Sequence, residues 1–565
     1  MDESHDVAKP TNNGGRVAAI VALVVLFGAA IIGLLALNGS DDEPQVAADT
    51  TPPSSTTPNT ETPSTTTPPP DTTTTTEPQL PAELAALISG DFADETIRVW
   101  VYDNTVAQNL IRLTPESFTD LGGPEVEFIF YEDYEPDDDL TASKVVRYQT
   151  ERDFGDDVVM IGGFYGSLFG ANGWLRVFHR EVETIFGPPF EGVFRDDEVA
   201  DLIPSVRETL SHVDLEEDLK GGGLFDGDLF ALPIQADGSL LMFNREILRN
   251  AGVELSENPT WNEVETTAAA VHTNDIAGIC IRTAPASVDN RSVLAPSHSS
   301  INERGSDGLI EPLTSMVNAF GGTWWEANED GTPGEAQINQ PDSGFRQATE
   351  FYATLVQEFG PDEPNLGFDE CFEQFANGQV AMWFDSTVAP ALLNDLDAAV
   401  SPNAGNFGAV ASPIGPTGIR SDWLNISALA LRTSYFGGRD DSAVVRAAAE
   451  FVRWASSEEY ARLVTEDLGW QAAPTTRLST LANPEYQQAT TPWGQVVSDA
   501  ITNADPNNPG TTPRPGLSGV QYVGIPEFRS VGNDCSVEFA SAIAGEITVN
   551  DALDNCQAIA TQASQ

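Results

Sequence analysis

Residues 231–263 read ALPIQADGSLLMFNREILRNAGVELSENPTWNE, and the local pattern changes twice within the first half of this stretch. Residues 231–234 are apolar, residues 235–238 are polar, and residues 240–243 are apolar again. Short apolar runs on either side of an Asp-Gly pair are typical of two strands around a turn. We therefore predict a polar corner between two strands, carrying one carboxylate and one carboxamide. Such a corner suits a hinge, or the wall of a cleft that binds hydroxyl groups.

Two helices are expected directly after this corner. Residues 244–251 have helical spacing and end before Gly252, a residue suited to the left-handed conformation at a helix C-terminus. Thr260 is placed to cap the next helix, with Glu263 three residues later as its reciprocal partner.

The charge of the chain is extreme, since 86 acidic and 27 basic residues give a formal net charge of -59 over 565 residues. Such a surface repels nucleic acid and anionic lipid, which excludes those partners. The simplest interpretation is a solvated acidic surface. The Asp run at 137–139 is a weak calcium signal, because no EF-hand spacing accompanies it.

The motifs of several enzyme classes are missing from the sequence. Lysine occurs at positions 9, 144 and 220 alone, and none belongs to a phosphate-binding G-x-x-x-x-G-K-[ST] loop. The five histidines form no H-E-x-x-H pair, and there is no G-x-S-x-G elbow. We predict no cofactor and no catalytic metal.

The four cysteines lack C-x-x-C spacing, which argues against zinc or a redox motif: they are Cys280, Cys371, Cys535 and Cys556. An even number in an exported chain suggests two disulfides, for which three pairings exist. We favour Cys535–Cys556, because both fall in adjacent C-terminal helices. The first is expected at 536–544, and the second begins near Thr548, where Asp551 completes a capping box. Cys280–Cys371 would then be the other pair.

An uninterrupted apolar run at 17–37 is long enough to span a bilayer. Basic residues precede it and acidic residues 41–43 follow, so we expect a cytoplasmic tail at 1–16 and the bulk of the chain outside the cell membrane as a single-pass protein. The alternative is a cleaved signal peptide, cut near 28–30.

Residues 38–81 are Thr/Pro-rich and of low complexity, which predicts an extended, disordered stalk. The globular part is then 82–565. It opens with strands expected at 97–102, 126–131 and 158–161.

Helices are expected at 106–121 and 140–151, between those strands. This βαβαβ order predicts an α/β fold with a parallel sheet. Ligands bind beyond the carboxyl ends of such strands, so Asn104 and Tyr165 are candidate ligand-binding residues.

Beyond these local patterns, the sequence resembles the extracellular solute-binding proteins of sugar ABC importers. The motifs that carry the resemblance follow one another in the family's order: residues 231–263, GICIR at 278–282, NAFGGTW at 318–324, FANGQVAMWFD at 375–385, FGAVASP at 407–413 and SGVQYVGIPEF at 518–528. The last motif is similar to that of the polyol branch, which takes mannitol and sorbitol.

The resemblance implies a two-lobed periplasmic-binding-protein-like fold of type II. The first lobe would be 95–234 plus 414–475, and the second 235–413 plus 476–565. The lobes would close on a polyol or sugar by hinge motion and deliver it to membrane permease subunits of the transporter. We expect a monomer without catalytic activity.

Polyols need carboxylates and amides for their hydroxyls, an arginine fork and aromatic rings beneath their C–H faces. The resemblance implies such roles for eight residues: Asp237, Gln235, Arg282, Asp385, Trp423, Asn425, Trp470 and Gln521. Each has a purely structural alternative, such as a turn at Asp237, a surface salt bridge at Arg282, a helix cap at Asp385 or a core position at Trp470.

Two alternatives of other classes stay open at this point. An extracellular carbohydrate hydrolase would need two carboxylates flanking a bond, for which Asp237 and Asp385 are candidates. A ligand-sensing receptor is disfavoured, because a tail of residues 1–16 carries no output module. The polar stretch at 284–308 is either a loop that covers the ligand or a surface insertion.

Overall fold

The computed structural model describes residues 92–102, 104–130, 157–163, 175, 196–212, 228–285, 308–328, 332–363, 365–396, 401–432, 442–511, 519–525 and 527–564. All of them lie in the second of the two units into which the chain divides, 78–565. The predictions for the tail, the apolar run, the stalk, the Asp run at 137–139, the helix at 140–151 and Tyr165 lie outside the described residues. Among the described residues, no helix combines the length and apolar character needed to cross a membrane.

The first strands form the parallel arrangement that the sequence predicts. Strand β1 (Thr96–Val101) pairs in parallel with β2 (Glu125–Phe130) and with β3 (Val158–Gly162). Helix α2 (Thr105–Ser117) and the short turn η1 (Thr119–Leu121) connect β1 to β2. This part of the α/β fold is confirmed, with element ends shifted by a few residues.

Strand β6 (Leu232–Asn244) is one uninterrupted strand of 13 residues. The predicted polar break at 235–238 is therefore wrong. Its cause is pairing, since Asp237 lies opposite Asn425 of strand β12 (Leu424–Leu431) and the ladder continues through the expected turn. Tertiary pairing of this kind overrides local turn preference.

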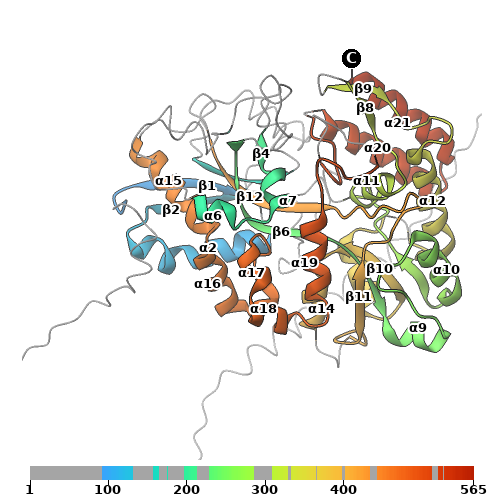
Figure 1. The fold of residues 1–565 in the computed structure, drawn as a ribbon, viewed down its shortest axis with the longest axis horizontal. Coiled ribbons are helices and arrows are strands. Elements are labelled where there is room, and N and C mark those ends of the chain that lie inside the picture. The colour runs from blue at the N-terminus through green and yellow to red at the C-terminus, as the bar shows by residue number, and fades with distance from the viewer. Residues whose placement is uncertain are drawn as a thin grey trace, which may run out of the picture. The chain divides into compact units, whose positions relative to one another are not determined.

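Strand β6 changes partners in its middle. Up to Gly238 it pairs with β12, and from Ser239 onward it pairs with β10 (Val380–Ser386) and β11 (Phe407–Ala411). The sheet order is β2-β1-β3-β12-β6-β10-β7, with β11 also on β6 and β7 spanning Ala277–Cys280. We call β1, β2, β3 and β12 with their helices the first lobe, and β7, β10 and β11 with theirs the second lobe, so β6 is a crossing strand between lobes (Figure 1).

The remaining elements lie around these strands. In the first part of the chain they are α6 (Asp196–Ala200), α7 (Pro204–Thr209), β4 (Ser211–His212), β5 (Asp228–Leu229), α9 (Arg245–Ala251), α10 (Trp261–Val271) and α11 (Ile310–Ala319). They continue with β8 (Trp325–Ala327), β9 (Pro333–Ala336), α12 (Gly344–Phe359), α13 (Phe368–Ala376) and α14 (Ala389–Asn394). The last are α15 (Ser442–Ala455), α16 (Glu458–Leu468), η6 (Trp470–Ala472), α17 (Leu478–Ala482), α18 (Pro484–Ala489), α19 (Gly494–Asn503), α20 (Phe528–Ile543) and α21 (Val549–Ala563).

Buried hydrophobic side chains form two clusters. One includes Ile97 and Val159 of the parallel strands together with Phe451 of α15. The other lies within the second lobe and includes Trp261 and Trp324. Figure 1 shows α2 below β1 and β2, and α10 and α12 to the right of β10.

The predicted helix ends are largely confirmed. Asn244 caps α9, and Gly252 follows it with φ 71°, in the left-handed region. The Thr260 side chain accepts from Glu263 N at the start of α10. The reciprocal half of the box is wrong, because the Glu263 carboxylate instead accepts from the backbone N and the hydroxyl of Ser256.

Both predicted disulfides are present, Cys280–Cys371 and Cys535–Cys556. The second joins α20 to α21, and α21 begins with the predicted box between Thr548 and Asp551. Helix α20 starts at Phe528, eight residues before the predicted 536. The extra turns bury Phe528 and Val531 against the second cluster, which is a tertiary effect.

One lobe assignment differs from the sequence prediction. Helix α17 packs against α16 and α18 packs against η6, and Leu478 N donates to Asp201 O at 2.8 Å. These contacts are with first-lobe elements, whereas the sequence assigned 476–565 as a whole to the second lobe. Helices α20 and α21 do pack on α12 of the second lobe. Motif order along a chain does not fix which lobe a connecting helix packs against.

Candidate functional site

The carboxyl ends of several strands from both lobes lie near the middle of β6. In the second lobe, β7 and β10 are parallel, and their carboxyl ends carry Arg282 and Asp385. Ser386, the last residue of β10, lies opposite Ser239 of β6. In the first lobe, the carboxyl end of β3 at Gly162 lies opposite Ser427 of β12. Arg282 and Asp385 therefore lie near the place where β6 changes partners.

Asp237 lies at this junction and is 2% exposed. Its Oδ2 accepts a hydrogen bond from the Ser386 hydroxyl at 2.6 Å, while its Oδ1 is buried without a hydrogen-bond partner among the described residues. Burial raises the pKa of Asp237 from 3.8 to about 7, and the Ser386 hydroxyl and the Arg282 charge oppose that shift. Asp237 is therefore a strand residue in contact with Ser386, and the structural alternative of a turn at this position is wrong.

Arg282 and Asp385 form a buried ion pair. The guanidinium Nε donates to Asp385 Oδ2 at 3.0 Å and Nη2 donates to Oδ1 at 2.6 Å. On its other side, Nη1 donates to Glu311 Oε2 at 2.9 Å. Glu311 is on α11, so three elements hold this triad together. Arg282 does form an ion pair, as its structural alternative predicted, but the pair is buried and not on the surface.

The Asp385 carboxylate is further engaged by its own strand. Its Oδ1 accepts from Ser386 N at 2.7 Å and its Oδ2 from Trp383 Nε1 at 3.3 Å. A carboxylate that accepts several hydrogen bonds and an ion pair is held in one orientation. Asp385 is thus placed beside Asp237 but is saturated by protein groups.

Trp423 and Asn425 enter the junction from the crossing segment that leads into β12. The Trp423 ring is buried, packs edge-on against Phe384 and lies 5.4 Å from the Arg282 guanidinium carbon. Asn425 is half-buried and is the strand partner of Asp237.

Asn104 follows strand β1 and caps helix α2. Its Oδ1 accepts from Ala107 N at 2.9 Å at the start of α2, which the sequence reading did not include. Its Nδ2 is buried without a partner among the described residues. An amide with one committed and one unpaired end can still bind a ligand through the donor end.

Two predicted glutamines have structural contacts. Gln521 bonds the backbone of Leu424 in both directions, accepting at 3.1 Å and donating at 2.7 Å, so it extends the ladder of β12. Gln235 donates weakly to Ala236 O at 3.3 Å and to Thr475 Oγ1 at 3.5 Å. The Gln521 amide therefore fixes the crossing segment.

Trp470 lies in η6, and its Nε1 donates to Glu485 Oε2 at 2.7 Å. Its core alternative is not met, because the ring is part-exposed. Most of the polar stretch 284–308 lies outside the described residues.

Sequence reasoning missed two residues of the junction. Ser386 directly follows Asp385 at the end of a strand, and that position was the signal that could have pointed to it. Glu311 follows the polar stretch 284–308 and had no motif of its own. Packing of α11 in the second lobe brings Glu311 to Arg282, and this contact cannot be seen in the sequence.

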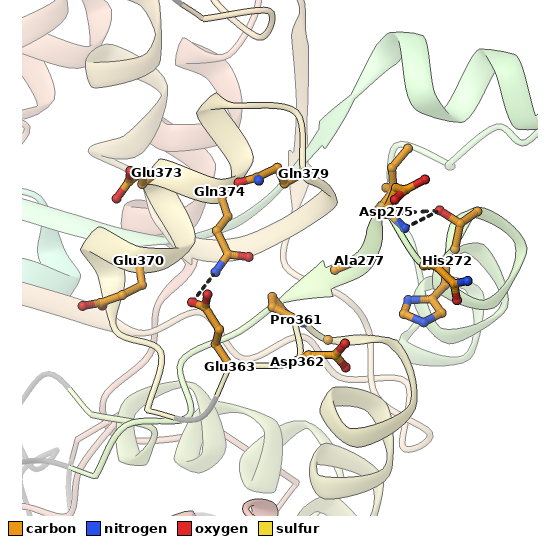
Figure 2. A pocket seen from close by; sticks show the side chains of 14 residues that line it. His272, Asp275, Ala277, Pro361, Asp362, Glu363, Glu370, Glu373, Gln374 and Gln379 are labelled. Atoms are coloured by element: carbon orange, nitrogen blue, oxygen red, sulfur yellow. Dashed lines mark hydrogen bonds between the residues drawn. The ribbon is translucent and has the colours of Figure 1, made fainter. Parts of the chain in front are cut away.

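A separate pocket of about 560 Å³ lies at the opposite edge of the second-lobe sheet. It is lined from the start of β7, the segment after α12, and α13, with Asp275, Glu363 and Glu370 among its carboxylates (Figure 2). Figure 2 shows Gln374 bonded to Glu363, at 3.1 Å, so part of the lining is already paired. The described residues include no group of three His, Cys, Asp or Glu side chains able to hold a metal ion.

Comparison with known protein families identifies the family to which the chain belongs. Residues 113–462 match the family described as bacterial extracellular solute-binding protein. The chain belongs to this family. A mannitol-binding protein of Pseudomonas aeruginosa is 28% identical over 409 residues, which is 71% of this chain and 78% of the relative.

Solved structures of family members have the same fold. A solute-binding protein of Agrobacterium vitis S4 with bound D-mannitol is 28% identical, with a TM-score of 0.64, 83% of this chain and 98% of that one being covered. A protein of Agrobacterium radiobacter K84 in complex with ribitol is 18% identical, with a TM-score of 0.61 and coverage of 83% and 98%. The two-lobed periplasmic-binding-protein-like α/β fold predicted from the sequence is thereby confirmed.

Proposed function

We propose that this solute-binding protein is the substrate-binding component of a carbohydrate ABC importer, and that it binds a polyol or sugar between its lobes. The two 28% identical relatives, one a mannitol-binding protein and one with D-mannitol bound, support a polyol. The protein would close on its ligand by rotation about the crossing strands and present the closed form to permease subunits.

The observation that carries this proposal is the unpaired oxygen of Asp237. A buried polar atom without a hydrogen bond costs about 1–3 kcal/mol, so it needs a compensating partner. A polyol hydroxyl donates to such a carboxylate oxygen and accepts from an amide such as Asn104 Nδ2. A ligand hydroxyl at each atom would satisfy both.

The same geometry favours binding over hydrolysis. A glycosidase needs a free general acid and a second free carboxylate on either side of the bond. Asp385 is saturated by Arg282, Trp383 and Ser386, so the pair with Asp237 offers a single unpaired carboxylate oxygen. We therefore assign binding without turnover.

We also propose that residues 17–37 anchor a monomer in the cell membrane and that residues 38–81 form a stalk, which places the binding lobes outside the cell. The support is the apolar length of the run, the charge difference across it and the Thr/Pro composition of the stalk.

A thermal-shift and calorimetry panel on the full-length protein tests the ligand class. Mannitol, sorbitol and ribitol should raise the unfolding temperature in a concentration-dependent way, because a ligand bound to the native state alone stabilises it. Asp237→Ala should abolish the best shift, while Asp534→Ala, at an exposed aspartate of α20, should leave it intact. Absence of a shift with every polyol and sugar in the panel would remove the assignment.

A further inference from the structure

We propose that Ser386, held by the buried Glu311–Arg282–Asp385 triad, is a positioning residue that fixes the Asp237 carboxylate with Oδ2 turned inward and Oδ1 presented to the ligand. This inference rests on the proposed function, because it deepens the role of Asp237 there. It assigns to Arg282 and Asp385 a role through Ser386 in place of direct ligand contact.

The contacts form one continuous chain. Glu311 and Asp385 hold the Arg282 guanidinium from two sides, at 2.9 Å and at 2.6 and 3.0 Å. Asp385 Oδ1 then accepts from the backbone N of Ser386 at 2.7 Å. The Ser386 hydroxyl donates to Asp237 Oδ2 at 2.6 Å. Each step is buried, so water does not compete for these groups.

The Ser386 hydroxyl has two contacts. Its oxygen accepts from Val388 N at 3.2 Å. Its one proton is donated to Asp237 Oδ2, which therefore acts as an acceptor. With Oδ2 in that role, a proton taken up by Asp237 resides on Oδ1, the oxygen without a partner among the described residues.

Oδ1 can thus act in two ways, as an acceptor when Asp237 is ionised and as a donor when it is neutral. Burial raises the pKa of Asp237 to about 7, and the charged groups that act on it are Arg282, which lowers the pKa, and Asp385, which raises it. The Ser386 hydroxyl and the Trp423 indole also lower it. A charge-assisted hydrogen bond is stronger than a neutral one, so a ligand hydroxyl should bind the ionised form more tightly.

Two measurable consequences separate this role from general structural support. Removing the Ser386 hydroxyl frees the carboxylate to rotate and removes a group that favours its ionised form. Ligand affinity should fall by about 5-fold, the equivalent of one hydrogen bond. The rise of affinity with pH, which in the wild-type protein should be half complete near pH 7, should also move to higher pH.

The test measures mannitol affinity by calorimetry from about pH 5.5 to about pH 8.5, bracketing the raised pKa. Ser386→Ala should show both the loss and the upward shift, and Ser386→Thr should restore both because it keeps the hydroxyl. Ser386→Cys, a weak donor of similar volume, carries the same expectation as Ser386→Ala if the latter does not fold. Ser401→Ala, which removes another buried hydroxyl of the second lobe, should leave the profile unchanged.

An unchanged pH profile in Ser386→Ala, or failure of Ser386→Thr to restore it, would overturn the positioning role. The outcome for Asp237→Asn tells this apart from failure of the proposed function. If Asp237→Asn flattens the profile while Ser386→Ala does not alter it, Asp237 binds the ligand without help from Ser386. If Asp237→Asn also binds mannitol as wild type does, the proposed site itself is misplaced.

Discussion

The guanidinium of Arg282 meets both carboxylate oxygens of Asp385, at 3.0 and 2.6 Å, with side chains that are 1% and 0% exposed. A pair so deeply buried is costly to break on one side, because the remaining charge has no water to replace its partner. Here two carboxylates would be left, since Glu311 depends on the same guanidinium.

Arg282→Met should therefore destabilise the protein by about 3–5 kcal/mol. Urea unfolding followed by fluorescence measures this loss. The matched control is Arg98→Met, which breaks the Arg98–Glu127 pair whose side chains are 46% and 53% exposed, and should cost less than about 1 kcal/mol. Equal losses in the two variants would contradict a special role for the buried triad.

Asp422→Asn should make stability less dependent on pH. Asp422 is 5% exposed beside the crossing strands, and burial raises its pKa from 3.8 to about 7, against the Ser412 hydroxyl and the Arg420 charge. A raised pKa means that the native state binds a proton that the unfolded state has lost, so the stabilising contribution is complete below about pH 4 and disappears as pH rises to about 7.

The Asn variant should accordingly be more stable than wild type above pH 7 and equal to it near pH 4, as judged by thermal unfolding over that range. Asp534→Asn, at an exposed position of α20, serves as the control and should follow the wild-type curve. A constant difference at every pH would show that Asp422 acts through packing alone.

Removing the two disulfides should have unequal costs. Cys280–Cys371 closes a loop of 91 residues and Cys535–Cys556 one of 21, while all four side chains are fully buried. Loop-closure entropy predicts losses of about 4–5 and about 3 kcal/mol for the respective double Cys→Ser variants. Denaturant unfolding of both variants measures the order, and a greater loss from the short loop would contradict the entropic account.

Salt should stabilise the protein. A net charge of -59 makes like-charge repulsion the dominant surface term in the compact state. Raising sodium chloride from about 0.1 M to about 1 M shortens the screening length from about 10 Å to about 3 Å, so the unfolding temperature should rise. Sucrose at equal osmolality is the control for solvent exclusion, and an equal rise in sucrose would remove the electrostatic explanation.

Local signals predicted the parts of the fold that depend on neighbouring residues. The parallel β1–β2–β3 arrangement, the helix end at Gly252, the cap at Thr548 and the Cys535–Cys556 disulfide follow from patterns within short windows. Cys280–Cys371 then follows as the remaining pair. The continuity of β6 could not be predicted, because Asp237 and Gly238 favour a turn and strand pairing with β12 overrides that preference.

The residues of the candidate site likewise fall into those that local sequence patterns predict and those that tertiary packing brings in. Asp237, Arg282 and Asp385 end or interrupt apolar strands, and the structure does bring them together. Glu311 enters through the packing of α11, which no window of sequence contains. Trp470 resembles a stacking residue by its position after Gly469, and its bond to Glu485 could not be predicted because it depends on how α18 packs on η6.

Strand β6 runs without interruption through both lobes, so the residues that it points into one lobe determine which residues it points into the other. Successive residues of a strand face opposite sides, and Asp237 in one half is four residues from Leu241 in the other. Adding or deleting one residue between them would turn every later side chain of β6 to the opposite face of the second lobe. The crossing strand can therefore change in length only in steps of two residues if the second lobe is to keep its core.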